Sequence, residues 1–386
     1  MIYLDNSATT ALSERAKERM YAVMECYGNP SSRHSLGLDA RKIIENARQQ
    51  VGTALGLSHP SAENLLFTSC GSESNNMAIL GSVYAKTRRR ANKIITTNSE
   101  HSSVENVMRK LEGDGFEVVR VPTVNGIVDE ELLMSEIDGK TLLLSLMLVN
   151  NETGAAYDVK RLFALASRKN PEIITHCDAV QGFLKLPMSL RSLGASMVSV
   201  SAHKIHGPKG VGALYISPDI IKQKKIVPYL IGGGQEGGLR SGTENVIGIA
   251  GFGEAAEEGY KNLSANINKM TSLRNLCERC VIEAGARPNI PKGARAPHLL
   301  SVTLPSIKSE TMLNFLSSKG ICVSSGSACS SHAKALSSSL LGFGLTPSEA
   351  DTTIRISFSE YNTEEEINTF VSALKEGIDT LVKIRR

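Results

Sequence analysis

The sequence predicts an α/β protein, with a large domain built on a mainly parallel β-sheet and a smaller α+β domain. Through the first two thirds of the chain, short apolar runs alternate with helix patterns. These runs are apolar almost throughout, as in strands that helices cover on both faces. The pattern changes near residue 260, where a long helix pattern opens a different series of elements. We therefore expect residues 14–258 to form the large domain, and residues 1–13 with 259–386 to form the small one.

The large domain begins with two helix patterns. Ser13 is a candidate N-cap for a first helix, which we expect to end near Gly28. The second pattern covers residues 39–56 and has an apolar face. That face consists of Ile43, Ile44, Ala47, Val51 and Leu55. Seven strand-like runs follow, at residues 63–70, 92–99, 116–123, 140–150, 172–180, 195–203 and 210–217. Helix patterns lie between most of these runs, including residues 102–113 and 159–169.

The remaining elements predict the smaller domain. Residues 257–285 look like one long amphipathic helix. Strand patterns follow at residues 298–305, 321–325 and 352–359. A helix pattern separates the first two of these strands, and a last helix begins near residue 363.

The composition is that of a folded chain without a strongly charged or lipid partner. With 386 residues, of which 41% are hydrophobic, the chain can build a sizeable core. The net charge of +4 is too small to indicate direct nucleic-acid binding. No apolar run is long enough to span a bilayer, and the N-terminal residues lack a signal-peptide pattern. The seven scattered cysteines favour free thiols, so we expect a cytoplasmic protein without a membrane partner.

Polar side chains gather at the predicted strand ends, where open α/β sheets bind their ligands. They stand at or just after the ends of four strand runs: His101, Asn151, Asp178 with Gln181, and His203 with Lys204. A lysine just beyond a buried strand is costly unless it is paired or used in chemistry. Structure alone does not explain this group, and we treat it as a candidate site.

A helix N-terminus offers a candidate phosphate cradle. Gly71 and Ser72 open a predicted helix, and backbone N–H groups with a hydroxyl in that place can hold a phosphate. Taken alone, a simple N-cap explains the two residues better. No Walker lysine follows them, so the stretch is not a P-loop.

Asp178 and Lys204 together indicate pyridoxal-phosphate chemistry. That cofactor needs a lysine for a Schiff base, a carboxylate facing its pyridinium nitrogen, and a phosphate cradle. Two strand ends can supply the first two, and three donors are available for the third. Those donors are Ser72, Ser201 and His203.

Several motifs in this order resemble the NifS/IscS-type cysteine desulfurases. They are "EHSSV", "VNNETG", "HCDAVQ", "SAHKIHGPKGVGALYIS", "RSGTEN" and "SSGSAC". The resemblance runs from "YLDNSATT" to "IRISFSEYNTEEEI" and so covers nearly the whole chain. These proteins are fold-type I pyridoxal-phosphate enzymes of the class V aminotransferase group, which implies a large domain with a mainly parallel seven-stranded sheet.

The resemblance implies a role for each candidate residue. Lys204 binds the cofactor covalently and moves the substrate Cα proton. Asp178 pairs with the pyridinium nitrogen, Gln181 bonds the phenolic oxygen, and His101 stacks on the ring and acts as an acid or base. The implied phosphate ligands are Gly71, Ser72, Ser201 and His203. Asn151, also a cofactor contact, holds the substrate carboxylate together with Arg355, whose planar fork suits that task.

Thr243 and Cys329 complete the implied site. Thr243 lies in a glycine-rich loop that reaches the phosphate of a partner subunit, which implies a homodimer. Cys329, in a loop of about residues 324–345, is the nucleophile that takes sulfur from L-cysteine as a persulfide and leaves L-alanine. The acceptor is then an iron–sulfur scaffold or a tRNA-thiolation relay. No metal site is implied, apart from a transient contact of Cys329 with an iron–sulfur cluster.

Two positions depart from the family pattern, and one motif stands outside it. Ser72 replaces a common threonine and keeps the hydroxyl, whereas Cys70 replaces a common glycine and puts the local loop geometry in doubt. Cys277 and Cys280 form a C-x-x-C on a predicted helix, but no second pair stands nearby, so a structural role is favoured.

Two other functions remain open at this stage. One is another reaction of the same cofactor, as in a selenocysteine lyase or another class V aminotransferase-type enzyme. Transamination needs no thiol, which argues against an aminotransferase, whereas selenocysteine is harder to exclude. The other is a sulfur-relay subunit without catalysis, which the presence of Lys204, Asp178 and His101 disfavours. A nicotinamide enzyme would need G-x-G-x-x-G after its first strand, and the sequence lacks it there.

Overall fold

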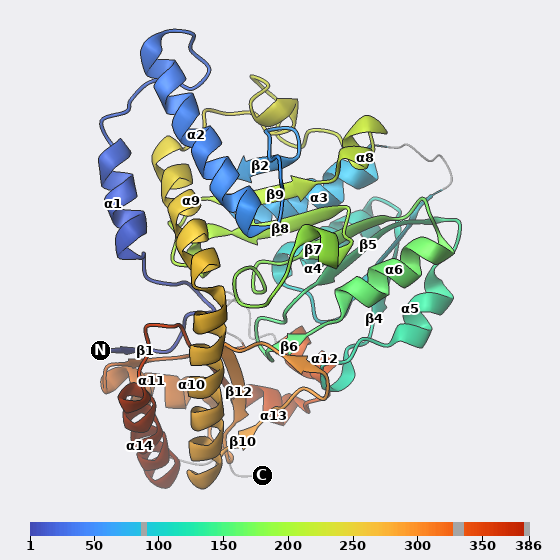
Figure 1. Cartoon of the computed structure of the whole chain (residues 1–386). Coiled ribbons are helices and arrows are strands. Elements are labelled where there is room, and N and C mark those ends of the chain that lie inside the picture. The colour runs from blue at the N-terminus through green and yellow to red at the C-terminus, as the bar shows by residue number, and fades with distance from the viewer. Residues whose placement is uncertain (86–90, 327–335, 382–386) are drawn as a thin grey trace.

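The large sheet has seven strands, as the sequence predicts. The computed structural model describes residues 1–85, 91–326 and 336–381 (Figure 1). The strands are β2 (Leu65–Thr68), β3 (Lys93–Thr97), β4 (Glu117–Val121), β5 (Thr141–Met147), β7 (Ile174–Asp178), β8 (Met197–Ser201) and β9 (Gly212–Ile216). Their order is β2-β9-β8-β7-β5-β3-β4. Every strand except β9 runs in the same direction, because β9 is antiparallel to both of its neighbours.

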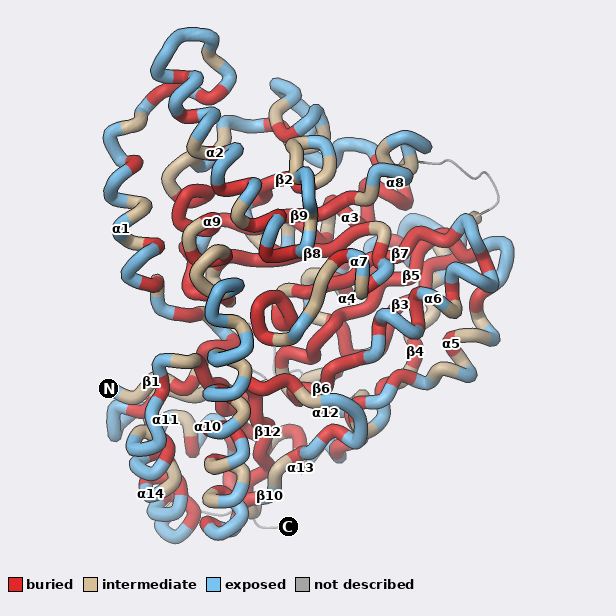
Figure 2. Tube along the Cα trace, in the orientation of Figure 1, coloured by how far each residue is buried: buried red, intermediate tan, exposed pale blue. Residues whose placement is uncertain are grey.

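Helices cover both faces of this sheet. One face packs on α2 (Ser35–Ala54), α5 (Glu130–Glu136), α6 (Val159–Lys169) and α9 (Val246–Lys261). The other packs on α3 (Gly71–Tyr84), α4 (Ser102–Gly113) and α8 (Pro218–Lys222). Neighbouring strand residues serve opposite faces, so Leu65 belongs to the first core and Leu66 to the second. Figure 2 shows the result, with buried strands between helices whose outer faces are exposed.

The first two helices differ from their predicted bounds. Ser13 caps α1 (Glu14–Val23) as predicted, since its side chain accepts a hydrogen bond from the Ala16 N–H. The helix ends at Val23, five residues before Gly28, and a Cβ on that glycine would collide with the backbone of Leu36. Helix α2 begins earlier than predicted, because His34 caps it. Its predicted apolar face is buried, except that Ile43 is only partly covered.

A second core holds the C-terminal elements. Four strands form an antiparallel sheet in the order β10 (Arg287–Pro288), β12 (Leu299–Thr303), β15 (Thr353–Ser357), β14 (Ser324–Ser325). Helices α10 (Leu263–Glu283), α11 (Ser309–Ser318) and α14 (Glu364–Thr380) contribute to this core. The N-terminal strand β1 (Ile2–Tyr3) joins it by pairing with β13 (Ile321–Cys322).

Short elements complete the described chain. The strands are β6 (Ala155–Ala156) and β11 (Ala294–Arg295), and the helices are α7 (Leu190–Leu193), α12 (Ser338–Phe343) and α13 (Pro347–Asp351). Three single-turn 3₁₀ helices cover Val124–Gly126, Ala202–Lys204 and Glu236–Gly238.

The predicted single helix over residues 257–285 is wrong at its start. Two helices, α9 and α10, meet at Asn262, whose backbone (φ −101°, ψ 7°) departs from helical values. Because α9 runs into α10 end to end (Figure 1), no loop marks the expected boundary between residues 258 and 259, and that boundary stays a prediction.

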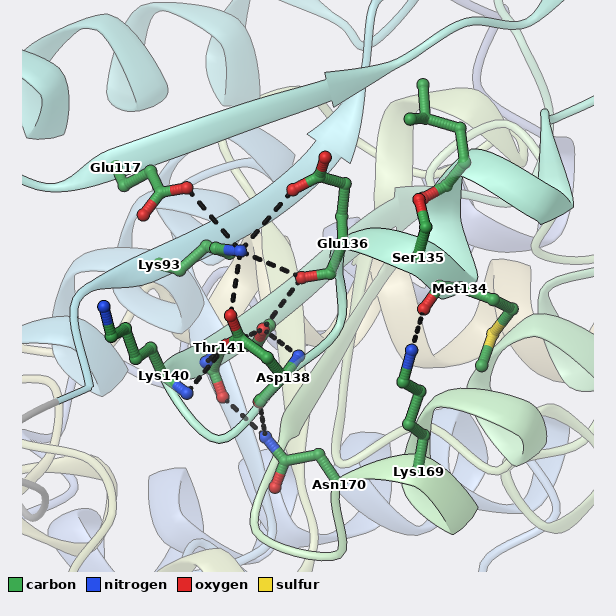
Figure 3. A network of polar contacts seen from close by, with 11 residues as sticks. Lys93, Glu117, Met134, Ser135, Glu136, Asp138, Lys140, Thr141, Lys169 and Asn170 are labelled. Atoms are coloured by element: carbon green, nitrogen blue, oxygen red, sulfur yellow. Dashed lines mark hydrogen bonds and ion pairs between the residues drawn. The ribbon is translucent and has the colours of Figure 1, made fainter.

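A buried lysine fastens the end of the sheet at which β3 begins. Figure 3 shows Lys93 Nζ among three carboxylates, at 3.1 Å from Asp138, 3.5 Å from Glu136 and 3.6 Å from Glu117. Burial alone would lower the lysine pKa, but the hydrogen bond and charge of Asp138, with the two glutamates, raise it. The lysine therefore stays charged. Since Lys93 begins β3 and His101 follows its other end, this network lies away from the candidate site.

Candidate active site

A cavity of about 470 Å³ opens beyond the carboxyl ends of the strands. It brings together nearly all of the predicted residues that the structure describes. They are Gly71, Ser72, His101, Asn151, Asp178, Gln181, Ser201, His203, Lys204 and Arg355. Thr243 is exposed and does not line the cavity, and Cys329 lies outside the described residues.

Asp178 ends strand β7 and is held from two sides. Its Oδ2 accepts a hydrogen bond of 2.7 Å from the Asn75 side chain, and its Oδ1 accepts one of 3.0 Å from the Val180 N–H. Asn75 also donates to the Ser103 hydroxyl at 2.9 Å. The carboxylate is thereby fixed in one orientation at the floor of the cavity. Sequence reasoning missed Asn75, although it lies in "GSESNN", the stretch that contains the predicted phosphate cradle.

Lys204 follows β8 in a 3₁₀ turn (Ala202–Lys204), and its amine contacts the N-terminal segment. Nζ donates to the carbonyl of Ser7 at 2.5 Å and to that of Ala8 at 2.8 Å. Those two carbonyls come from "DNSATT", more than 190 residues away in sequence. The amine therefore has backbone acceptors that hold it at the cavity wall, while β7 and β8, adjacent in the sheet, place Asp178 and Lys204 together.

His101 is the N-cap of α4, and its protonation state follows from its contacts. Nδ1 accepts a hydrogen bond of 3.1 Å from the Ser103 N–H, so in the neutral ring the proton lies on Nε2. Burial lowers the pKa of His101, and the positive charges of Lys204 and Arg355 lower it further against the opposing charge of Asp178. The ring is therefore neutral near pH 7 and presents an N–H at Nε2.

The residues predicted to hold the phosphate lie together on the wall of the cavity. Gly71 opens α3, and a Cβ there would lie 2.7 Å from a Val180 methyl carbon, so the close approach requires glycine. The buried hydroxyl of Ser201 has no hydrogen-bond partner within the described part of the chain. A helix N-terminus beside an unpaired buried donor fits an anionic phosphate. Burial, with the charges of Lys204 and Lys209, lowers the pKa of His203 to about 4, so this ring is neutral.

Cys70 does not disturb the cradle. Its backbone is extended (φ −174°), which any residue adopts, and its Sγ caps α3 by accepting from the Glu73 N–H at 3.4 Å. The helix therefore begins where the sequence predicts, although cysteine stands in place of the family's common glycine.

Arg355 and Asn151 meet at the other end of the cavity. Arg355 lies on β15, and its fork donates to the Asn151 carbonyl and to Asp5 Oδ1, both at 2.9 Å. The guanidinium Nε and the Asn151 side-chain oxygen are buried without a partner in the described chain. Sequence reasoning missed Asp5, because nothing local in "YLDNSATT" shows that the segment crosses to β15.

Gln181 joins the N-terminal segment to a buried histidine. Its Nε2 donates to the Ser7 carbonyl at 2.9 Å, and its Oε1 lies 3.3 Å from His298 Nε2. Burial and several nearby cations hold the pKa of His298 well below its usual range, so a neutral ring donates to Gln181. His298 was not predicted, and its only signal is a histidine just before the apolar strand β12.

Glu152 is a second acidic residue on the cavity wall that the sequence did not single out. It follows Asn151 in "VNNETG". Burial raises the pKa of Glu152 to about 7, against the hydrogen bond of Ser337 and the charge of Arg355. The protonated form of this carboxyl is therefore favoured to a higher pH than in an exposed glutamate.

Two of the remaining cysteines, Cys177 and Cys277, are buried as a structural role would require. The six described cysteines are free thiols. Within the described ranges, no group of three or more histidine, cysteine and acidic residues could hold a metal ion. Cys277 is fully buried in α10, where burial raises its thiol pKa, and Cys177 is fully buried in β7. No helix in the described part of the chain could cross a membrane.

Known proteins match this chain along nearly its whole length. The family model described as aminotransferase class-V matches residues 2–370. A protein named cysteine desulfurase from Trichormus azollae is 36% identical, over 99% of this chain and 94% of its own. Cysteine desulfurase IscS of Dictyoglomus turgidum is 37% identical, over 98% and 95%. A solved structure titled NifS-like protein is 39% identical with a TM-score of 0.91, covering 98% of this chain and all of that one.

Proposed function

The chain belongs to the class-V aminotransferase family and, within it, to the pyridoxal-phosphate-dependent cysteine desulfurases, and on this premise we propose how its residues divide the reaction. One observation supports the division most strongly. Asp178 and Lys204, at adjacent strand ends, lie in one cavity with an arginine and with the residues predicted to hold a phosphate.

The cavity fits the cofactor. When bound, pyridoxal phosphate supplies the electron sink that labilises bonds at the substrate Cα. The Asp178 carboxylate would face its ring nitrogen, because Asn75 and the Val180 N–H fix it in the cavity. The phosphate would take the places around Gly71, Ser72, Ser201 and His203, where a buried hydroxyl lacks a partner. Gln181 would donate to the phenolic oxygen, and Lys204 would bind the carbonyl carbon.

Two residues of this chain would move protons. Lys204 donates to two backbone carbonyls, which orient its amine at the cavity wall. After the amine loses a proton, its two remaining N–H groups can still donate to these carbonyls. His101 is neutral with its proton at Nε2, so it can stack on an aromatic ring and donate from that atom. Burial keeps it neutral, and the charges of Lys204 and Arg355 add to this effect against the charge of Asp178.

Arg355 and Asn151 would bind the substrate carboxylate. The guanidinium has a buried Nε without a partner in the described chain, and Asp5 holds the fork in place from the other side. A bidentate pair with the substrate would satisfy Nε and add the specificity of a fixed fork. The Asn151 side chain lies beside it in the cavity, and its amide N–H would be the group that donates to the carboxylate.

Cys329 would be the nucleophile. Its sulfur bonds to the substrate sulfur as the substrate C–S bond breaks, which leaves a persulfide on the protein and, after protonation of carbon, L-alanine. The residue lies outside the described part of the chain, but Ser324, Ser325 and Gly326, just before it, line the cavity. We propose that the persulfide sulfur passes to an acceptor protein, for iron–sulfur cluster assembly or another thiolation pathway.

The same proposal includes a homodimer in the cytoplasm. Thr243 is exposed and outside the cavity, as expected of a residue that serves the phosphate of a second copy. Exposed apolar side chains precede its loop, with Ile231 at 85% exposure and Tyr229 at 50%. A second copy covering them would bury apolar surface that water otherwise contacts. The free cysteines suit a reducing compartment.

Two variants test this assignment. Lys204→Ala should lose both sulfide release from L-cysteine and the visible absorption of the covalently bound cofactor. Cys329→Ser should keep that absorption and lose sulfide release. Full activity in Cys329→Ser would overturn the nucleophile, and turnover in Lys204→Ala would overturn the mechanism. For the dimer, sedimentation should give two copies, and Thr243→Ala should weaken cofactor affinity without separating them.

A further inference from the structure

Glu73 is an acidic residue in the first turn of α3, the helix whose N-terminus is proposed to hold the phosphate. The proposed reaction gives it no role. Its Oε2 accepts a hydrogen bond of 2.7 Å from the Ser69 N–H, so the carboxylate folds back over the start of the helix. Its own N–H donates to Cys70 Sγ at 3.4 Å. A negative charge is thereby fixed at the same helix end as Gly71 and Ser72.

This placement sets a carboxylate against the anion that the same helix end would bind. The free N–H groups at a helix N-terminus attract negative charge. A carboxylate in that place takes up part of the attraction, and it also repels a phosphate held at the same end. An ionised Glu73 is therefore unfavourable for phosphate binding unless a cation compensates it.

Arg240 supplies such a cation from a distant part of the chain. Its Nε donates to Glu73 Oε1 at 2.8 Å, and its Nη2 donates to Glu73 Oε2 at 3.4 Å, in a forked contact. The two side chains are 17% and 15% exposed, so salt and water screen the pair only in part. Burial alone would raise the pKa of Glu73, but the hydrogen bonds from Arg240 and Ser69 hold it below its usual range. Glu73 is therefore ionised near pH 7 and paired with Arg240.

The glycine-rich loop that carries Arg240 is itself firmly held. Arg240 forms a parallel β-bridge with Leu230 at the start of this loop. Between them, the buried Glu236 accepts from the Arg48 guanidinium at 2.7 Å and from the Phe67 N–H at 2.9 Å. The loop is thereby tied to α2 and β2, so the guanidinium of Arg240 is carried by an anchored backbone.

We propose that Arg240 compensates the charge of Glu73 and thereby keeps the N-terminus of α3 favourable for the cofactor phosphate. The inference rests on the proposed phosphate site and adds two residues to its account. Neither side chain is among the described residues that line the cavity, so both act through the start of α3 and not by touching the cofactor. Arg240 and Glu73 are therefore positioning residues.

A role limited to holding the loop predicts a different result. Thr243, which is proposed to serve a second copy, lies in the same loop as Arg240. If the ion pair only fastened this loop, removal of either partner would weaken phosphate binding alike. Under compensation the two removals act in opposite directions, because one leaves an unpaired carboxylate at the phosphate site and the other leaves an unpaired cation. The sign of the Glu73 effect therefore separates the two roles.

The test is titration of the cofactor-free protein with pyridoxal phosphate and with pyridoxal, followed by absorbance, in the absence of cysteine. Arg240→Ala should lower the affinity for pyridoxal phosphate about 5-fold and leave the affinity for pyridoxal, which lacks the phosphate, unchanged. Glu73→Gln keeps an acceptor for the Ser69 N–H and loses the charge, so it should raise the affinity for pyridoxal phosphate. The double variant should recover to within about 2-fold of the wild type.

Two further variants serve as controls. Arg287→Ala breaks an ion pair with Glu349, which lies in the smaller set of C-terminal elements, and should leave both affinities unchanged. Arg240→Lys keeps the positive charge without the fork, so it should retain most of the affinity for pyridoxal phosphate. This variant does not depend on whether the fold tolerates alanine at position 240.

Four results would each overturn the inference: an unchanged affinity in Arg240→Ala, equal losses for the two ligands, a loss in Glu73→Gln, or no recovery in the double variant. The measurement involves no turnover. Its failure is therefore distinct from failure of the proposed function, which would appear as activity persisting in Lys204→Ala or Cys329→Ser.

Discussion

The Asn75 side chain on α3 donates a 2.7 Å hydrogen bond to Asp178 at the end of β7. The helix whose N-terminus is proposed to hold the phosphate thus also orients the carboxylate that would face the cofactor ring. Both contacts depend on how α3 lies across the sheet, so one packing arrangement sets two parts of the cofactor site.

Replacing Asn75 should weaken the cofactor site. In Asn75→Ala, Asp178 loses its side-chain donor and keeps only the Val180 N–H, so cofactor affinity should fall about 10-fold, the size expected for a hydrogen bond to a charged group. Titration of the cofactor-free protein with pyridoxal phosphate, followed by absorbance, measures this. Asn368→Ala, at an exposed position of α14, is the control. Equal cofactor affinities of Asn75→Ala and the wild type would show that Asp178 does not need Asn75 to hold its orientation.

Replacing Asp5 should affect substrate binding more than chemistry. Asp5 accepts from the Arg355 fork at 2.9 Å and so orients the proposed carboxylate ligand. Asp5→Ala should raise KM for L-cysteine about 10-fold, with a smaller change in kcat. Asp5→Asn keeps an acceptor oxygen, so its KM should lie between those of the wild type and Asp5→Ala. Steady-state kinetics decide, and an unchanged KM in Asp5→Ala would remove Asp5 from the site.

Glu100 should make stability fall as pH rises. Burial raises the pKa of Glu100 to about 8, although Thr97 and the Met147 N–H donate to its Oε1. An acid with a raised folded pKa stabilises the fold below its unfolded value near 4.5, and this contribution is lost as pH rises through about 8. The unfolding free energy of Glu100→Gln, relative to that of the wild type, should therefore rise by about 2–4 kcal/mol between pH 5 and 8.5. Urea unfolding at both pH values measures the difference, which would be constant if Glu100 were already ionised at pH 5.

Lys93 should matter for stability and not for the reaction. Lys93→Met leaves the carboxylates of Asp138, Glu136 and Glu117 without their shared cation (Figure 3). Because these carboxylates are partly exposed, the loss should be about 1–3 kcal/mol of unfolding free energy. Denaturant unfolding checks this, with sulfide release near the wild-type value. A matching loss of kcat at saturating cofactor would contradict the separation of this network from the cavity.

The sequence predicts the site well where a residue follows a strand. His101, Asn151, Asp178 and Lys204 could be grouped because the carboxyl ends of parallel strands meet at one edge of a sheet. The sheet and most helices could be predicted from the pattern of apolar residues. Buried strands are continuous apolar runs, and the apolar residues of a helix repeat with the helical period.

The contacts that complete the site could not be predicted in this way. Ser7 and Ala8 reach Lys204, and Asp5 reaches Arg355, across separations of roughly half the chain or more. No periodicity within a segment reports such pairings. The break at Asn262 was missed for a related reason, because its neighbours keep helical composition on both sides. The resemblance supplied roles, whereas the contacts of Asn75 with Asp178 and of Asp5 with Arg355 required the coordinates.

The most direct test of the central claim is mass spectrometry of the enzyme after a single addition of L-cysteine. The account predicts a gain of one sulfur atom on the peptide with Cys329, and no gain in Lys204→Ala or Cys329→Ser. A persulfide on another cysteine, such as Cys70 beside the phosphate cradle, formed equally in Cys329→Ser, would contradict it.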